Sequence, residues 1–516
     1  MHQKNGLIFR FFELILLRMK NVQLHVSKSL YIRKLIYDFL YNDGIGEIPS
    51  DSPEDVRVVH QCLTIISKAN FCSAESAVPQ RIDVRDCGAA YRFLMAVLAV
   101  TPGQWLLTGT PRLMQRPIDE LVQVLCEMGA EIQWRSCRDA INRVSTNENC
   151  GCWFILGKNL HASELTIDCT RSGQFASALW LISKKIGLKK LHVLPENPSS
   201  SAYIAMTKAI VEGKADMDAK RLGDWSAAVY WYARLLLEGQ ICRSQRSHSP
   251  SGTVSCDAPA SYKLLHLDLQ SLQSDAIIAQ WFAQWGVLSR QKEDGVVIEF
   301  KKIVDCQKNT LTSGDENASQ NEEIKLDKSA GIQYDVIKSD EGSVGLEDND
   351  QEDTIELDMS QNLDLVPVLA CMACLWPKKM IFNGVANLQY KESNRLQIIQ
   401  EQLSSFSIIE IKSYKGIPDN QLVINPICRD GVCPVSDEDG VAIRGDVPCH
   451  VSTNDHCSNI PPRIFSFDAH NDHRFVMGFS LFALKGKVQI KDFDCVRKSY
   501  PDFKAEGVVA GTDMVG

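Results

Sequence analysis

The chain has 516 residues, of which 45% are hydrophobic and 23% charged, and its net charge at pH 7 is −9. A chain of this length is longer than a single hydrophobic core usually accommodates, so we expect two or more domains. The composition is that of a globular protein, and the negative charge argues against nonspecific nucleic-acid binding, which needs a broad basic surface.

The N-terminal segment NGLIFRFFELILLRMK, residues 5–20, is apolar but interrupted by Arg10 and Glu13. It is too short to span a bilayer, and no small-residue cleavage site follows it. We expect a packed helix or strand here, with Met19 as an alternative start of translation. The 18 cysteines are expected to be free thiols in a reducing cytosol, which predicts a cytoplasmic protein. Six of them could ligate a metal, but their spacing matches no paired CxxC pattern, so we expect none: Cys150, Cys152, Cys428, Cys433, Cys449 and Cys457.

An amphipathic helix followed by a strand recurs along the chain. The clearest copies are residues 118–134, 274–291 and 394–412, and weaker helices are expected at 54–67 and 202–211. Gly129 and Gly286 mark the turns of the first two copies. The recurrence predicts an α/β protein built from copies of one unit. Three polar or irregular stretches interrupt it and are interpreted as loops or insertions: 243–260, 305–354 and 425–467.

Cations and hydroxyl groups recur at the N-terminal ends of apolar helices. Each motif alone is weak, and an ordinary helix cap or a buried ion pair explains it at least as well. Together, helices that present cations and free N–H groups at one end would converge on an anionic ligand. The motifs are SKSLYIRK with Lys28, Ser29 and Arg33; DCGAAYRF with Gly88 and Arg92; TGTPRLMQRPIDE with Arg112 and Arg116 on a loop and Pro117 opening a helix; RSGQF with Ser172, Gly173 and Gln174; LDMSQNLDLV with Asp364; NLQYKESNRL with Lys391, Glu392 and Arg395; NDHRF with Asp472, His473 and Arg474; and CVRKSYPDF with Lys498.

Taken in this order, the motifs resemble the enolpyruvyl transferase family, and within it the branch that acts on shikimate 3-phosphate. RPIDEL, KESNRL and NDHR carry the resemblance, which covers most of 27–232, 273–300 and 357–503. It implies an α/β (α+β) fold of two similar domains, each built from three βαβαββ units, with the active site in the interdomain cleft. One domain would be residues 26–224, and the other would combine residues 1–25 and 225–516.

The resemblance implies transfer of the enolpyruvyl group of phosphoenolpyruvate to the 5-hydroxyl of shikimate 3-phosphate, a step of the shikimate pathway, by a monomer without metal or cofactor. Asp364 would be the base, Glu392 would carry a proton to C3 of phosphoenolpyruvate, and Lys28 would assist. The residues implied for shikimate 3-phosphate are Lys28, Ser29, Arg33, Ser172, Gly173, Gln174, Ser200, Tyr203, Asp364, Asn387 and Lys391. Those implied for phosphoenolpyruvate are Lys28, Gly88, Arg92, Arg116, Gln174, Arg395, Arg474 and Lys498.

The chain departs from the family pattern at Asp86, where the family usually has Asn, and at Ala89, where it usually has Thr. An extra carboxylate would repel an anion unless it is paired or turned away. Two alternatives stay open. One is a degenerate member that binds a ligand or partner without turnover. The other is the relative acting on UDP-N-acetylglucosamine, which is disfavoured because no cysteine lies between Thr110 and Arg116.

Overall fold

The structure is a computed structural model, and it describes residues 19–42, 44–69, 78–136, 151–196, 201–215, 217–218, 221–247, 261–300, 354–426, 435–436, 442–443, 464–504 and 508–510. The chain divides into two compact units, Met1–Lys301 with Thr354–Gly516, and Lys302–Asp353. The second unit lies wholly outside the described residues. The predicted N-terminal helix or strand also lies outside them up to residue 18.

Three four-stranded sheets of the first unit share one topology. In each, the first two strands are parallel and the last two form an antiparallel hairpin whose final strand pairs with the second. The first sheet contains β2 (Gln80–Asp83), β3 (Gly103–Thr108), β4 (Glu131–Ser136) and β5 (Gly151–Gly157). The second contains β11 (Thr354–Asp358), β12 (Lys379–Asn383), β13 (Ser407–Tyr414) and β14 (Ile417–Pro426). The third contains β1 (Met19–Val22), β8 (Ser261–Leu265), β9 (Val287–Lys292) and β10 (Gly295–Phe300).

Helices connect these strands in the order strand, helix, strand, helix, strand, strand. They are α4 (Gly88–Val100) and α6 (Asp119–Glu127) in the first sheet, and α11 (Val366–Leu375) and α12 (Arg395–Leu403) in the second. In the third sheet, the connecting helices are α9 (Trp225–Ser247) and α10 (Ile278–Gln284). The predicted helix-then-strand copies are therefore confirmed as α6–β4, α10–β9 and α12–β13. Gly129 and Gly286 have φ of +96° and +92°, which glycine adopts without strain.

Smaller sheets accompany the three. Strands β6 (Glu164–Asp168) and β7 (Lys190–Leu194) are parallel, and so are β17 (Ile464–Asp468), β18 (Lys487–Lys491) and β19 (Val508–Ala510). The short strands β15 (Val435–Ser436) and β16 (Ala442–Ile443) form a separate pair. The remaining helices are α2 (Lys28–Tyr41), α3 (Glu54–Lys68), α5 (Pro111–Met114), α7 (Gln174–Ile186), α8 (Ser201–Val211) and α13 (His473–Ser480), with the 3-10 helices η2 (Ser274–Ile277), η3 (Leu363–Leu365), η4 (Ala386–Tyr390), η5 (Leu481–Leu484) and η6 (Phe493–Lys498).

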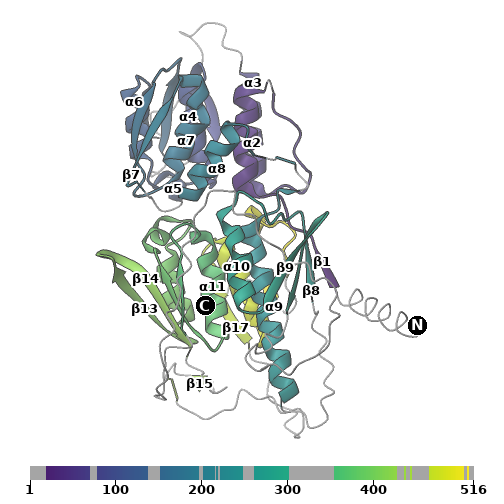
Figure 1. Cartoon of the computed structure of the whole chain (residues 1–516). Helices are drawn as coiled ribbons and strands as arrows, with labels where there is room; N and C mark the ends of the chain where they lie inside the picture. Colours follow the sequence, from purple (N-terminus) through teal and green to yellow (C-terminus); the bar gives the residue numbers. More distant parts are fainter. Residues whose placement is uncertain are drawn as a thin grey trace, which may run out of the picture. The chain divides into compact units, whose positions relative to one another are not determined.

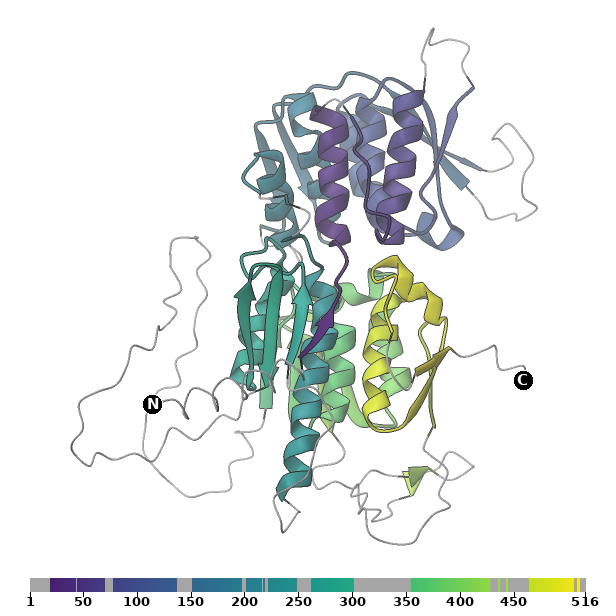
Figure 2. The ribbon, with the colours of Figure 1, turned by 90° about the vertical axis from the view of Figure 1, so that its right-hand side faces the viewer.

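The apolar side chains form two separate cores. One runs from Leu30 to Leu222, and within it α2, α4, α7 and α8 pack together (Figure 1). The other joins Val22 and Leu24 to residues from Trp225 onward, and within it α9, α11 and α13 pack together (Figure 2). Helices α4 and α11 are apolar on every face except at Arg92 in the first turns of α4, which is why both are buried. That the cores are two domains, with the boundaries given above, stays a prediction.

Three local expectations are wrong. Helix α9 continues to Ser247, into the loop expected from residue 243, because residues 243–249 contain no proline or glycine that would end it. Pro117 does not open a helix, since α6 begins at Asp119 and the Pro117 carbonyl accepts hydrogen bonds from Arg92. Arg112 lies in the short helix α5 rather than on a loop. Among the described helices, none is both long and apolar enough to cross a membrane.

Candidate active site

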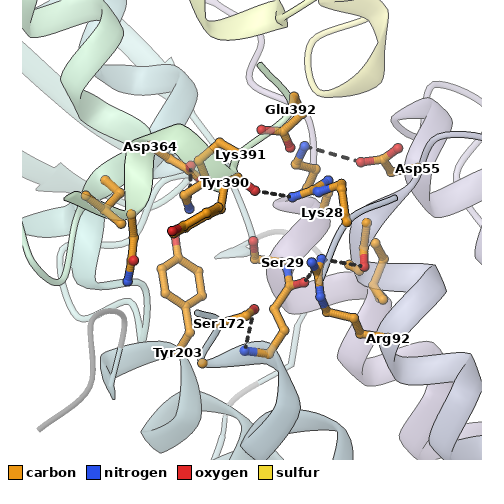
Figure 3. A pocket seen from close by; sticks show the side chains of 18 of the residues that line it. Lys28, Ser29, Asp55, Arg92, Ser172, Tyr203, Asp364, Tyr390, Lys391 and Glu392 are labelled. Carbon is orange, nitrogen blue, oxygen red and sulfur yellow. Dashed lines mark hydrogen bonds and ion pairs between the residues drawn. The ribbon is translucent and has the colours of Figure 1, made fainter. Parts of the chain in front are cut away.

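One pocket gathers most of the residues singled out in the sequence. It encloses about 960 Å³ including its opening, and it is bordered by the N-terminal ends of α2, α3, α4 and α7 and by the segment around η4. Figure 3 shows Glu392, Lys391 and Asp364 on one side and Lys28, Ser29 and Arg92 on the other. The lining residues are Lys28, Ser29, Ile32, Arg33, Asp55, Gly88, Ala89, Arg92, Arg116, Arg171, Ser172, Gly173, Gln174, Tyr203, Leu363, Asp364, Asn387, Tyr390, Lys391 and Glu392.

Three guanidinium groups line this pocket without a carboxylate partner among the described residues. Arg33 Nε donates to Thr207 Oγ1 at 2.6 Å, and its Nη1 donates to the Ser29 carbonyl at 2.7 Å. Burial lowers the pKa of Arg33 to about 10. A buried cation whose neighbours are only neutral oxygens and aromatic rings is unfavourable by itself, so an anion in the pocket would stabilise it.

Arg92 and Arg116 form the second part of this cationic surface. Arg92 donates to the Pro117 carbonyl and to Gln174 Oε1, the latter at 2.9 Å. Burial and then the positive charge of Arg116 lower the pKa of Arg92 to about 9. Arg116 donates to the Tyr390 carbonyl at 3.4 Å, and its buried Nε has no hydrogen-bond partner in the described structure. Arg116 Nε is therefore available to a bound anion, and the Arg92 guanidinium lines the pocket beside it.

On the other side of the pocket, Arg395 is surrounded by three carboxylates. Its Nε lies 2.8 Å from Asp472 Oδ2, its Nη1 2.8 Å from Asp364 Oδ1, and its Nη2 2.9 Å from Glu392 Oε2. Lys391 Nζ is also 3.2 Å from Asp364 Oδ1. The side chain of Arg395 is 0% exposed, so these carboxylates offset its desolvation.

This arrangement keeps two pocket carboxylates ionised. Burial would raise the pKa of Asp364, yet Lys391 and Arg395 hold it well below its usual range. Burial would likewise raise the pKa of Glu392, yet Arg395, Arg116 and Lys28 hold it well below its usual range. Both side chains are thus proton acceptors at neutral pH when the pocket contains no substrate.

Lys28 lies between an acid and an imidazole. Its Nζ is 3.2 Å from Asp55 Oδ2 and 3.4 Å from His473 Nε2. Burial acts to lower the pKa of Lys28, but the charges of Asp55 and Glu392 outweigh it and raise the pKa, so Lys28 stays a cation. Burial, with Lys28 and Arg474 nearby, holds the pKa of His473 well below its usual range, so its imidazole is neutral.

The NDHR segment places Asp472 at the start of α13 and Arg474 in its first turn. Asp472 caps α13 by accepting from the Arg474 backbone N–H at 3.1 Å, while its carboxylate binds the Arg395 side chain and not the Arg474 side chain. Arg474 is 1% exposed, and its Nε and Nη1 have no hydrogen-bond partner within the described ranges. Asp224, Asp364 and Asp275 act on it through space, and they outweigh burial to raise its pKa.

Most of the predicted site residues line the pocket: Lys28, Ser29, Arg33, Gly88, Arg92, Arg116, Ser172, Gly173, Gln174, Tyr203, Asp364, Asn387, Lys391 and Glu392. Arg395, Arg474 and Lys498 do not line it, and Ser200 lies outside the described residues. Sequence reasoning missed Asp55, Arg171 and Tyr390. Arg171 and Tyr390 lie inside the quoted motifs RSGQF and NLQYKESNRL, whereas Asp55 stands in an ordinary first helical turn and carries no such signal.

No group of three or more potential metal ligands occurs in the part of the chain that the structure describes. Of the six candidate ligands, the structure describes Cys152, which is buried. The other five cysteines named as candidate ligands lie outside the described residues, so that expectation stays a prediction.

The fold and the pocket together define a class: repeated βαβαββ units that carry an anion-binding pocket with uncompensated guanidinium groups facing paired carboxylates. Comparison with known proteins is consistent with this class. A family model described as EPSP synthase (3-phosphoshikimate 1-carboxyvinyltransferase) matches residues 55–214 and 450–506. Over these two segments the chain is therefore similar to the EPSP synthase family of enolpyruvyl transferases.

Individual relatives are distant but cover most of the chain. A 3-phosphoshikimate 1-carboxyvinyltransferase of Dehalococcoides mccartyi is 24% identical over 427 residues, which cover 81% of this chain and 76% of the relative. One of Pseudomonas syringae pv. tomato is 25% identical over 494 residues, covering 92% and 91%. A solved structure of EPSP synthase from Acinetobacter baumannii superposes with a TM-score of 0.51 at 14% identity, covering 94% of this chain and 93% of that one, which shows a shared fold.

Proposed function

We propose that this protein transfers the enolpyruvyl group of phosphoenolpyruvate to the 5-hydroxyl of shikimate 3-phosphate, releasing phosphate. The observation that carries the proposal is a set of three guanidinium groups, those of the buried Arg33 and Arg92 and of the half-buried Arg116, that line the pocket without carboxylate partners among the described residues. Both proposed substrates carry a phosphate and a carboxylate. Substrates of that charge would supply the counterions that the protein itself does not.

The two substrates would occupy different parts of the pocket. Ser29 and Arg33 on α2 would hold the shikimate carboxylate, and the Ser172–Gly173 turn before α7 would hold its phosphate. A hydroxyl and backbone amides at a helix start suit a phosphate group. Arg92 and Arg116 would bind phosphoenolpyruvate beside Gly88, whose missing side chain leaves room for the Arg116 guanidinium.

The reaction would proceed by addition and then elimination. The hydroxyl oxygen forms a bond to C2 of phosphoenolpyruvate while Asp364 takes the hydroxyl proton and Glu392 gives a proton to C3. In the second step C3 returns a proton to Glu392, the bond from C2 to the phosphate oxygen breaks, and the double bond re-forms. The proton held by Asp364 leaves with phosphate. Lys28, which stays a cation in this site, would stabilise the charge on the leaving phosphate.

The protonation of Glu392 has to change when substrates bind. In the substrate-free pocket Arg395, Arg116 and Lys28 favour its ionised form. Substrate anions that pair with Arg116 and Lys28 would cancel much of that positive field, so the pKa of Glu392 would rise towards values at which it carries a proton. Binding of the anions would therefore prepare the acid that the addition step requires.

The test is an assay of the purified full-length chain with phosphoenolpyruvate and shikimate 3-phosphate, measuring phosphate release. Release that requires both compounds supports the proposal. Binding of both compounds without release would instead support a member that binds without turnover. Release only with UDP-N-acetylglucosamine as acceptor would assign the chain to the other branch of the family.

A further inference from the structure

An ion pair outside the pocket lining joins two distant parts of the chain. Asp86, in the turn that precedes α4, pairs through its carboxylate with Lys498 Nζ at the end of η6. Lys498 Nζ also donates to the Asn471 carbonyl at 3.3 Å. The Lys498 side chain is 15% exposed and that of Asp86 is 38% exposed, so the carboxylate can return to solvent more easily than the ammonium group.

This pair lies next to the proposed phosphoenolpyruvate subsite. Gly88, two residues after Asp86, lines the pocket beneath Arg116. Burial lowers the pKa of Lys498, but the hydrogen bond and charge of Asp86, followed by the charges of Glu392 and Asp55, outweigh burial and raise it. Glu392 and Asp55 both line the pocket, so Lys498 is within electrostatic reach of a ligand there.

We propose that Asp86 is a positioning residue that holds Lys498 away from the pocket until an anionic substrate replaces the Asp86 carboxylate as the partner of Lys498. The proposal rests on the proposed function, because the displacing group would be the phosphate or carboxylate of phosphoenolpyruvate. Binding then exchanges one anionic partner of Lys498 for another, and the Asp86 carboxylate is released to water. Asp86 thereby lowers the affinity for the anion, since its own attraction to Lys498 has to be overcome.

The direction of the change in phosphoenolpyruvate affinity distinguishes a competing Asp86 from one that supports binding. If Asp86 competes with the substrate, Asp86→Asn keeps the shape but removes the charge, and phosphoenolpyruvate should bind more tightly. We expect the Kd for phosphoenolpyruvate, measured without an acceptor so that no turnover occurs, to fall by about 1.5- to fivefold, the range that the strength of a partly exposed ion pair corresponds to. The Kd for shikimate 3-phosphate alone should not change.

The experiment is titration calorimetry on the full-length chain and on Asp86→Asn, with phosphoenolpyruvate and, separately, with inorganic phosphate. Asp294→Asn is the matched control, because it removes an equal charge from the Asp294–Lys263 ion pair (2.8 Å), and neither residue lines the pocket. Lys498→Met with and without Asp86→Asn completes a double-mutant cycle. The gain from Asp86→Asn should disappear when Lys498 is absent.

Each outcome either supports or overturns the proposed role of Asp86. An unchanged or raised Kd in Asp86→Asn would overturn the proposal, as would a gain that persists without Lys498 or that Asp294→Asn reproduces. If neither the wild type nor Asp86→Asn binds any of these anions, the proposal also fails. Tighter binding in Asp86→Asn without phosphate release from either protein would leave this inference standing while refuting the proposed transferase activity.

Discussion

Gly88→Ala tests the position of Arg116 with the smallest possible change. A Cβ at residue 88 would lie 2.5 Å from Arg116 Nη1 and 3.1 Å from its Cζ. Restoring a contact of 3.4 Å to Nη1 requires the guanidinium to withdraw by about 0.9 Å. Because the end of an arginine side chain is flexible, the fold should tolerate this change, whereas a bound anion would lose its hydrogen bond.

A charge-assisted hydrogen bond contributes about 1.5–3 kcal/mol, so its loss predicts a fall in kcat/KM for phosphoenolpyruvate of roughly 10- to 100-fold. The KM for shikimate 3-phosphate should stay near that of the wild type, because Arg33 and Ser172 are untouched. Initial rates of phosphate release with each substrate varied in turn would measure both. Gly46→Ala is the control, since a Cβ there meets nothing within 4 Å. Equal effects on both substrates, or none on phosphoenolpyruvate, would refute the reasoning.

Further predictions concern the carboxylates around Arg395. Glu392→Gln should keep substrate binding, measured by calorimetry, and lose most turnover. Glu401→Gln, on the exposed face of α12, is the control and should change neither. Unchanged turnover in Glu392→Gln would remove Glu392 from the mechanism. Asp472→Asn should lower the free energy of unfolding by about 3–5 kcal/mol in urea, because it leaves Arg395 buried with less compensation; a loss below about 1 kcal/mol would contradict this. The depressed pKa of Glu392 means that its stabilising effect is complete above about pH 4.5 and is lost as the pH falls through its folded-state pKa. The melting temperature of Glu392→Gln should therefore fall less steeply below pH 4.5 than that of the wild type, and parallel curves would speak against an ionised Glu392.

Local patterns in the sequence predicted the elements well where one physical signal dominated. Apart from Arg92, the helices α4 and α11 are apolar all round, and the turns at Gly129 and Gly286 require positive φ, so both features were readable without the fold. The end of α9 was not readable, because a polar Ser- and Arg-containing segment can continue a helix or leave it.

The sequence predicted which residues form the site but not which acidic side chain binds which basic one. Arg395 and Asp472 are 77 residues apart, and no periodicity in the sequence indicates that the Asp472 carboxylate binds the Arg395 side chain. Asp55 was missed because an acid in a first helical turn is ordinary helix chemistry, and only the fold brings it to Lys28. Asp86 was noticed as a departure from the family pattern, but its partner Lys498 comes from the far end of the chain.

The most direct measurement is a phosphorus NMR time course of the purified chain with phosphoenolpyruvate and shikimate 3-phosphate in one tube. We predict that the phosphoenolpyruvate signal falls while inorganic phosphate and one new phosphate ester, the enolpyruvyl product, rise in equal amounts. Glu392→Gln should leave the starting signals unchanged over the same time. Persistence of both substrates with the wild-type protein, or phosphate release without the new ester, would contradict the proposed transfer.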